Sequence, residues 1–191
     1  MKPTLRDIQM GNNEQLSNKI TIKKAPTFEE AAEAIKVFCN EELKRQIVIA
    51  KRVIKGYPPQ TSFSNLKITY HTSKRFYKSR GGRRGGKPFI TLSLYKWIQN
   101  LMCGESHCTF DEYALIENDR QIGEVNGSIE KCLSALIAHE LSHAIQHALK
   151  ANMSDSSMVF GYNKTQFKKP HGYAWRYIYG LLRKYAVNEA K

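Results

Sequence analysis

The segment that follows Asn126-Gly127-Ser128 constrains the fold of this chain most, because apolar residues recur through it at helical spacing. Ser128 is a favourable N-cap for such a helix. The spacing predicts a helix over residues 129–150 with an apolar face that packs against a sheet. The residues of that face are Ile129, Cys132, Leu133, Leu136, Ile137, Leu141, Ala144, Ile145 and Ala148.

This predicted helix carries His139 and His143, whose side chains project from one face, one turn apart. Two imidazoles in this arrangement can bind one Zn²⁺ at roughly 2.0–2.1 Å. Glu140 lies beside the first histidine, where its carboxylate can accept a proton from water as a general base. The segment His139-Glu140-Leu141-Ser142-His143 matches the H-E-x-x-H pattern. It predicts a zinc-dependent hydrolase, and a peptidase is the preferred activity.

A catalytic zinc site needs a third protein ligand and leaves the fourth position for water. His147 lies one further turn along the helix, roughly 6 Å beyond His143, so one ion cannot easily reach both His139 and His147. Metzincins require a glycine and a third histidine where this chain has Gln146 and Leu149, so that class is excluded.

Two later residues are candidates for the third ligand. Asp155 can reach the metal after a turn. His171 is preferred, because Lys169-Pro170-His171-Gly172 ends a loop just before the last predicted helix, and a loop end can bring a side chain into the site. We therefore expect one Zn²⁺ per chain, held by His139, His143 and His171.

Few other residues show a recognisable chemical pattern. Tyr162 or Tyr173 can donate a hydrogen bond to an oxyanion, although packing is the simpler role for each. The cysteines form no C-x-x-C pair, which excludes a zinc ribbon and predicts free thiols. They are Cys39, Cys103, Cys108 and Cys132.

Charge is distributed unevenly along a chain whose formal net charge is +13. Residues 43–104 contain fourteen Lys and Arg and no Asp or Glu. Such a stretch suits phosphate backbones or acidic partners, and a basic protein without a nucleic-acid role is the alternative. Within it, four glycines and four cations at 79–88 predict a flexible loop, with a solvated hairpin tip as the alternative. Candidate contacts to nucleic acid are Lys78, Arg80, Arg83, Arg84 and Lys87.

The rest of the chain alternates between helical and strand patterns, so we predict an α+β fold. Residues 1–25 are polar and aperiodic and are expected to form an N-terminal arm, and residues 26–191 are expected to form one domain. A capping box at Thr27–Glu30 begins the first helix. The predicted elements are helices at 28–40, 41–54 and 172–187, strands at 66–70, 89–95 and 112–116, and an irregular stretch at 152–170.

The motif at 139–143, followed by His171-Gly172-Tyr173-Ala174-Trp175, resembles the SprT-like family, which includes the Spartan DNA–protein crosslink proteases. The resemblance implies a zincin-like fold with a small mixed sheet, an edge strand lining the cleft and three histidine ligands. It also implies proteolysis associated with DNA. The zinc ribbon common in this family is absent. We therefore expect residues 43–104, the basic stretch, to make any contacts with single-stranded or structured DNA.

Together these patterns predict a zinc metalloprotease that acts on DNA-associated proteins. The alternative is a basic accessory protein that binds nucleic acid or a host factor and has a structural or non-catalytic zinc site. The N-terminus lacks the apolar core of a signal peptide, and the apolar runs are too short to span a bilayer. We therefore expect no membrane partner and an intracellular location, either cytoplasmic or at the nucleoid or nucleus.

Overall fold

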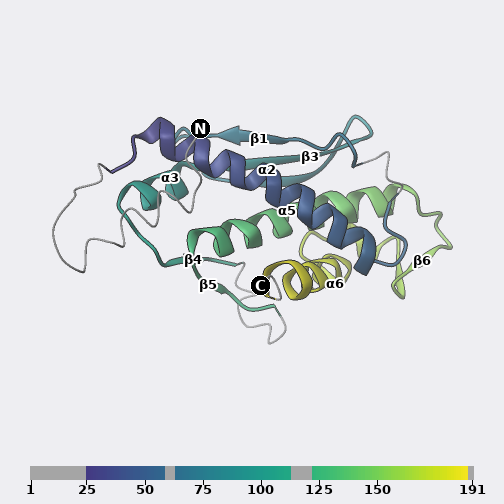
Figure 1. Cartoon of the computed structure of the whole chain (residues 1–191). Helices are drawn as coiled ribbons and strands as arrows, with labels where there is room; N and C mark the ends of the chain where they lie inside the picture. The colour runs from purple at the N-terminus through teal and green to yellow at the C-terminus, as the bar shows by residue number, and fades with distance from the viewer. Residues whose placement is uncertain (1–24, 59–62, 113–121, 189–191) are drawn as a thin grey trace.

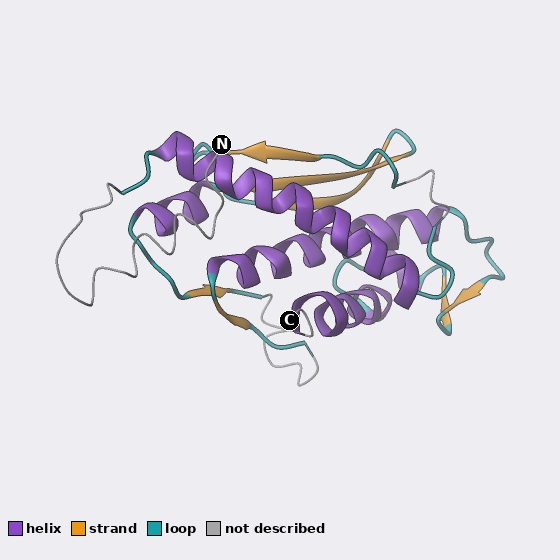
Figure 2. Ribbon diagram, viewed as in Figure 1, coloured by secondary structure: helices purple, strands orange, loops and turns teal. Residues whose placement is uncertain are grey.

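The computed structural model describes residues 25–58, 63–112 and 122–188 of the chain. The predicted N-terminal arm at 1–25 lies outside these residues except for Ala25. Helices and small sheets are mixed along the described chain, which confirms the α+β class (Figures 1 and 2).

Helix α2 (Phe28–Val53) begins at the predicted capping box. The Thr27 hydroxyl accepts from the Glu30 N–H at 3.2 Å, and the Glu30 carboxylate accepts from the Thr27 N–H at 2.8 Å. The helix is continuous, so the predicted division into helices at 28–40 and 41–54 is wrong. One buried face, which includes Cys39 and Leu43, runs across the predicted junction, and packing of this face favours a single helix.

A three-stranded sheet lies above the helix that carries the histidines (Figure 1). Strand β3 (Lys87–Ser93) is central, paired in parallel with β1 (Ile68–His71) and antiparallel with β2 (Arg80–Arg84). Helix α5 (Ile129–Ala151) packs against β2 and β3, and helix α6 (Tyr173–Leu182) packs against the other side of α5. Helix α5 is therefore buried between the sheet and α6.

The glycine-rich segment forms strand β2 and a tight turn into β3, so the predicted flexible loop at 79–88 is wrong and the alternative, a hairpin tip, is confirmed. Gly85 and Gly86 have φ values of +54° and +81°, which suit a two-residue hairpin turn. Gly81 lies so close to α5 that a Cβ atom there would be 1.8 Å from the Glu140 carbonyl oxygen. The glycines thus allow close strand–helix packing instead of loop flexibility.

The remaining elements surround this core, and several differ from expectation. The helix that follows β3 was not predicted, and a short hairpin occupies part of the predicted irregular stretch 152–170. Of the predicted strand 112–116, Glu112 is not in a strand, and 113–116 lie outside the described residues. The last predicted helix is α6 followed by a π-helical turn. These elements are α3 (Tyr95–Met102), β4 (Cys108–Phe110), β5 (Val125–Gly127), β6 (Met158–Val159), β7 (Tyr162–Asn163), the 3-10 helix η3 (Gln166–Lys168) and η4 (Arg183–Asn188).

Within the described part of the chain, no helix combines the length and apolar character needed to cross a membrane.

Replacement of Gly81 by alanine should lower the free energy of unfolding by about 1–3 kcal/mol, because the new methyl group forces β2 away from α5. Chemical denaturation measures this change. The matched control is Gly180→Ala in α6, where the atom nearest to an added Cβ belongs to a side chain 4.0 Å away. This control should be neutral or stabilising by up to ~1 kcal/mol. Equal stability of the two variants would contradict the close contact.

Candidate metal centre

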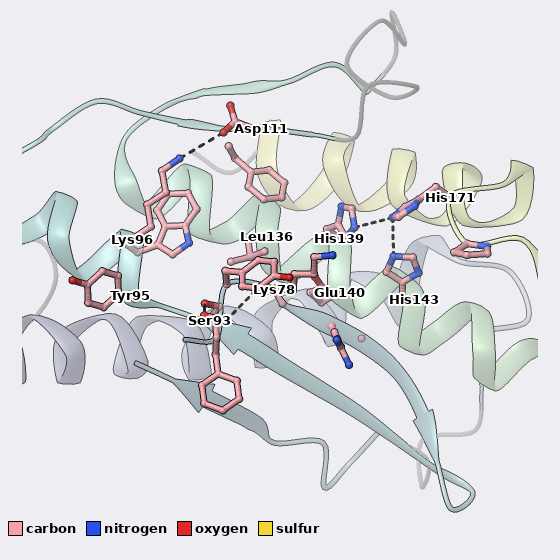
Figure 3. A pocket seen from close by; sticks show the side chains of 18 of the residues that line it. Lys78, Ser93, Tyr95, Lys96, Asp111, Leu136, His139, Glu140, His143 and His171 are labelled. Atoms are coloured by element: carbon pink, nitrogen blue, oxygen red, sulfur yellow. Dashed lines mark hydrogen bonds and ion pairs between the residues drawn. The ribbon is translucent and has the colours of Figure 1, made fainter. Parts of the chain in front are cut away.

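Three imidazoles converge on one point between α5 and the start of α6 (Figure 3). The Nε2 atom of His171 lies 3.0 Å from that of His143 and 3.1 Å from that of His139. Tetrahedral zinc ligands at roughly 2.0–2.1 Å from the ion lie roughly 3.3 Å from one another, so the three nitrogens fit such an ion with a small expansion. His139, His143 and His171 therefore lie close enough to hold a metal ion, as the sequence predicted.

The loop before α6 brings His171 to the two histidines of α5. Gln146, buried on α5, donates from its amide to the carbonyl oxygens of Phe167 and Lys169, each at 3.1 Å. His171 itself has a φ of +57°, a region that costs a non-glycine residue of order 1–3 kcal/mol. The amide of Gln146 thus fixes the loop to the helix that carries His139 and His143.

Trp175 packs against all three imidazoles from α6. Its ring centroid lies 4.7 Å from that of His139, 5.1 Å from His143 and 4.6 Å from His171. The Trp175 side chain is fully buried. This packing restricts the orientations available to the three rings.

Glu112 orients the His139 ring through its Nδ1 atom. No sequence pattern indicated this role for Glu112. Its Oε2 lies 3.2 Å from Nδ1 of His139, and its Oε1 accepts from the Tyr179 hydroxyl and from Arg183 at 3.4 Å. Since the carboxylate accepts, Nδ1 of His139 carries the proton and the Nε2 lone pair faces the centre. Glu112 is 27 residues from His139 in sequence, and no local motif marks it.

The environment keeps two of the three imidazoles neutral, the form that binds metal ions. Burial, helped by the proximity of His139, lowers the pKa of His143 from 6.5 to about 2. Burial likewise lowers the pKa of His171 to about 4. These two side chains are ready to coordinate a cation without first losing a proton.

Glu140 is beside the triad and only 5% exposed. Burial raises the pKa of its carboxyl from 4.5 to about 7, against smaller lowering effects of His139 and of a hydrogen bond from the Gly81 backbone. A carboxylate with a pKa near neutrality is suited to accept and return a proton. The close approach of β2 at Gly81 thus also places a backbone donor on this carboxylate.

The triad and Glu140 lie in a cleft of about 940 Å³ (Figure 3). Trp97, Phe110 and Leu136 form an apolar part of its lining. Residues 76–81, the last two of which belong to edge strand β2, form another part. An edge strand therefore forms part of one wall of the cleft.

The other predicted candidates lie apart from the triad. His147 is exposed and lines the cleft, but it is not part of the histidine group that can hold a metal. Asp155 is exposed and pairs with Lys164 at 3.1 Å, so the alternative third ligand is not supported. Tyr162 and Tyr173 stack on each other with centroids 6.3 Å apart, and neither is among the residues that line the cleft.

The predicted nucleic-acid contacts are all exposed but lie in two places. Lys78 and Arg80 line the cleft. Arg83, Arg84 and Lys87 lie at the tip of the β2–β3 hairpin, where the Arg84 guanidinium is 5.2 Å from the Phe89 ring centroid.

The purified protein should contain about one zinc per chain, and His171→Ala should lose it because two imidazoles alone hold zinc weakly. Elemental analysis after gel filtration measures the content. His147→Ala is the matched control and should keep the metal. Zinc retained in full by His171→Ala would exclude His171 as a ligand.

Glu112→Gln should weaken zinc binding by about 10- to 100-fold, because a neutral amide orients His139 less well than a carboxylate. Competition with a chelator measures this affinity. The exposed Glu105→Gln removes the same charge elsewhere and should have no effect. If Glu112→Gln bound zinc as tightly as Glu105→Gln, the orienting role would be wrong.

Comparison of the chain with protein-family models, with curated proteins and with solved structures finds no match. The resemblance to SprT-like proteases therefore depends on the two sequence motifs alone.

Proposed function

We propose that this protein is a zinc-dependent metalloprotease of the SprT-like type. The observation that carries the proposal is the convergence of three imidazole nitrogens beside a buried glutamate in an open cleft. A structural zinc site usually has four protein ligands, whereas a catalytic site has three and leaves one position for water or substrate. The triad supplies three, so its donor set supports catalysis over a purely structural role.

The residues of the chain have distinct parts in peptide hydrolysis. His139, His143 and His171 would hold the zinc, which supplies Lewis acidity toward a water molecule and a carbonyl group when bound. Glu140 accepts a proton from the water as its oxygen bonds to the carbonyl carbon. Glu140 then returns that proton to the departing amide nitrogen as the carbon–nitrogen bond breaks.

The shape of the cleft supports a protein substrate. Strand β2 is at the end of its sheet, and an extended peptide can lie along such an edge. Trp97, Phe110 and Leu136 line an apolar region of the same cleft, which suits a substrate side chain.

The positive charge around the cleft supports association with DNA. Lys78 and Arg80 are exposed at its wall, and the hairpin tip adds Arg83, Arg84 and Lys87. Together these cations suit contacts with phosphates. A protein bound or crosslinked to DNA is therefore the proposed substrate, which would place the enzyme at the nucleoid or in the nucleus.

Glu140→Gln should bind zinc normally but cleave protein at least ~10²-fold more slowly, because the amide cannot accept the proton. Proteolysis of a generic substrate and of a DNA-binding protein, each with and without DNA, measures this effect. The control is Glu130→Gln, which removes a charge from the first turn of the same helix, roughly 15 Å along its axis.

Two results would argue against the proposal. Cleavage by Glu140→Gln at the rate of Glu130→Gln would exclude Glu140 as the base. A zinc-loaded wild-type protein that cleaves neither substrate under any of these conditions would favour a binding protein with a non-catalytic metal site.

A further inference from the structure

Four exposed cations and two exposed aromatic rings lie together in residues 74–80, here called the rim segment. Phe76 is 50% exposed and Tyr77 is 79% exposed, values unusual for large hydrophobic side chains. The cations around them are Lys74, Arg75, Lys78 and Arg80. All of these residues except Arg75 line the cleft that contains the histidine triad.

Contacts with β1 and β3 hold the rim segment in place. The Ser93 hydroxyl donates to the Phe76 carbonyl oxygen, and the Ser93 N–H donates to the Ser79 hydroxyl at 3.1 Å. The His71 ring stacks on Phe76, with centroids 4.1 Å apart and an interplanar angle of 13°. The exposed rings are therefore presented by an ordered backbone, which reduces the entropy lost on binding.

Tyr77 differs from Phe76 in having no ring stacked on it in the described structure. The Lys78 ammonium lies over one face of the Tyr77 ring, 5.4 Å from the ring centroid. Because the ring is 79% exposed, its other face can take a planar, electron-rich group.

We propose that the rim segment binds unpaired nucleotides, with a base stacked on Tyr77 and phosphates beside Lys74, Lys78 and Arg80. Stacking on an aromatic side chain requires a base that is free of its duplex, so the site selects single strands. An acidic peptide would satisfy the cations but would leave the Tyr77 ring unused. This proposal extends the DNA association proposed above and places single-stranded nucleic acid along one wall of the metal cleft.

Binding can be measured without any proteolysis, so the test is independent of the proposed enzyme activity. Fluorescence anisotropy of a short labelled oligothymidylate should show roughly 10-fold or more weaker binding by Tyr77→Ala, whereas Tyr77→Phe keeps the ring and the affinity. The matched control is Tyr173→Ala, since this tyrosine is 68% exposed but does not line the cleft. Thermal unfolding should be the same for all three variants.

The salt dependence separates stacking from charge. Tyr77→Ala should leave the slope of log affinity against log salt unchanged, and Lys74→Gln with Lys78→Gln should reduce it by about 0.7 for each phosphate that is no longer neutralised. The same measurement with oligouridylate shows whether the site accepts ribose, and tight binding in either arm supports it. Duplex DNA of equal length should bind more weakly and should not respond to Tyr77→Ala.

Three outcomes would overturn the proposal. The first is equal binding by Tyr77→Ala and Tyr173→Ala. The second is duplex binding that falls with Tyr77→Ala as much as single-strand binding. The third is displacement of the oligonucleotide by polyglutamate as readily as by unlabelled oligonucleotide, which would identify the rim segment as a site for acidic peptides.

Discussion

Strand β2 approaches helix α5 so closely that Gly81 leaves no room for a side chain beside the Glu140 carbonyl oxygen. The approach closes the sheet over helix α5 and brings a backbone donor to the Glu140 carboxyl. It also makes β2 one wall of the cleft. The position of the proposed base, the shape of the cleft and the direction of the basic hairpin all depend on this one contact between a glycine and a helix backbone.

Around that contact, the structure must stabilise polar side chains in a largely apolar interior. A buried polar group is costly unless it has a partner. Glu112 supplies one for His139 and is itself bound by Tyr179 and Arg183, while Trp175 packs against the imidazoles. A metal ion would satisfy the remaining Nε2 lone pairs, which is the physical reason why this arrangement suits a metal centre.

Much of the site could be predicted from sequence because its signals are local. The four-residue spacing of His139 and His143 is a property of any α-helix, and Ser128 marks where that helix begins. The glycine-rich segment was harder, since glycine favours both flexible loops and close packing, and only the neighbouring helix decides between them. The predicted division of α2 at residues 40–41 was wrong for a similar reason. Packing of its buried face against the core stabilises one continuous helix there, and the local sequence does not show this packing.

The sequence by itself determined the helix, the two histidines and the adjacent glutamate, because helical periodicity fixes which side chains share a face. It also made His171 the preferred third ligand. Only the tertiary structure decided that the His171 imidazole reaches the other two, since a loop can place its end in many positions. The structure alone revealed Glu112, which meets His139 through the fold and not through the chain. Long-range contacts of this kind have no local pattern in sequence, because burial and neighbouring elements set them.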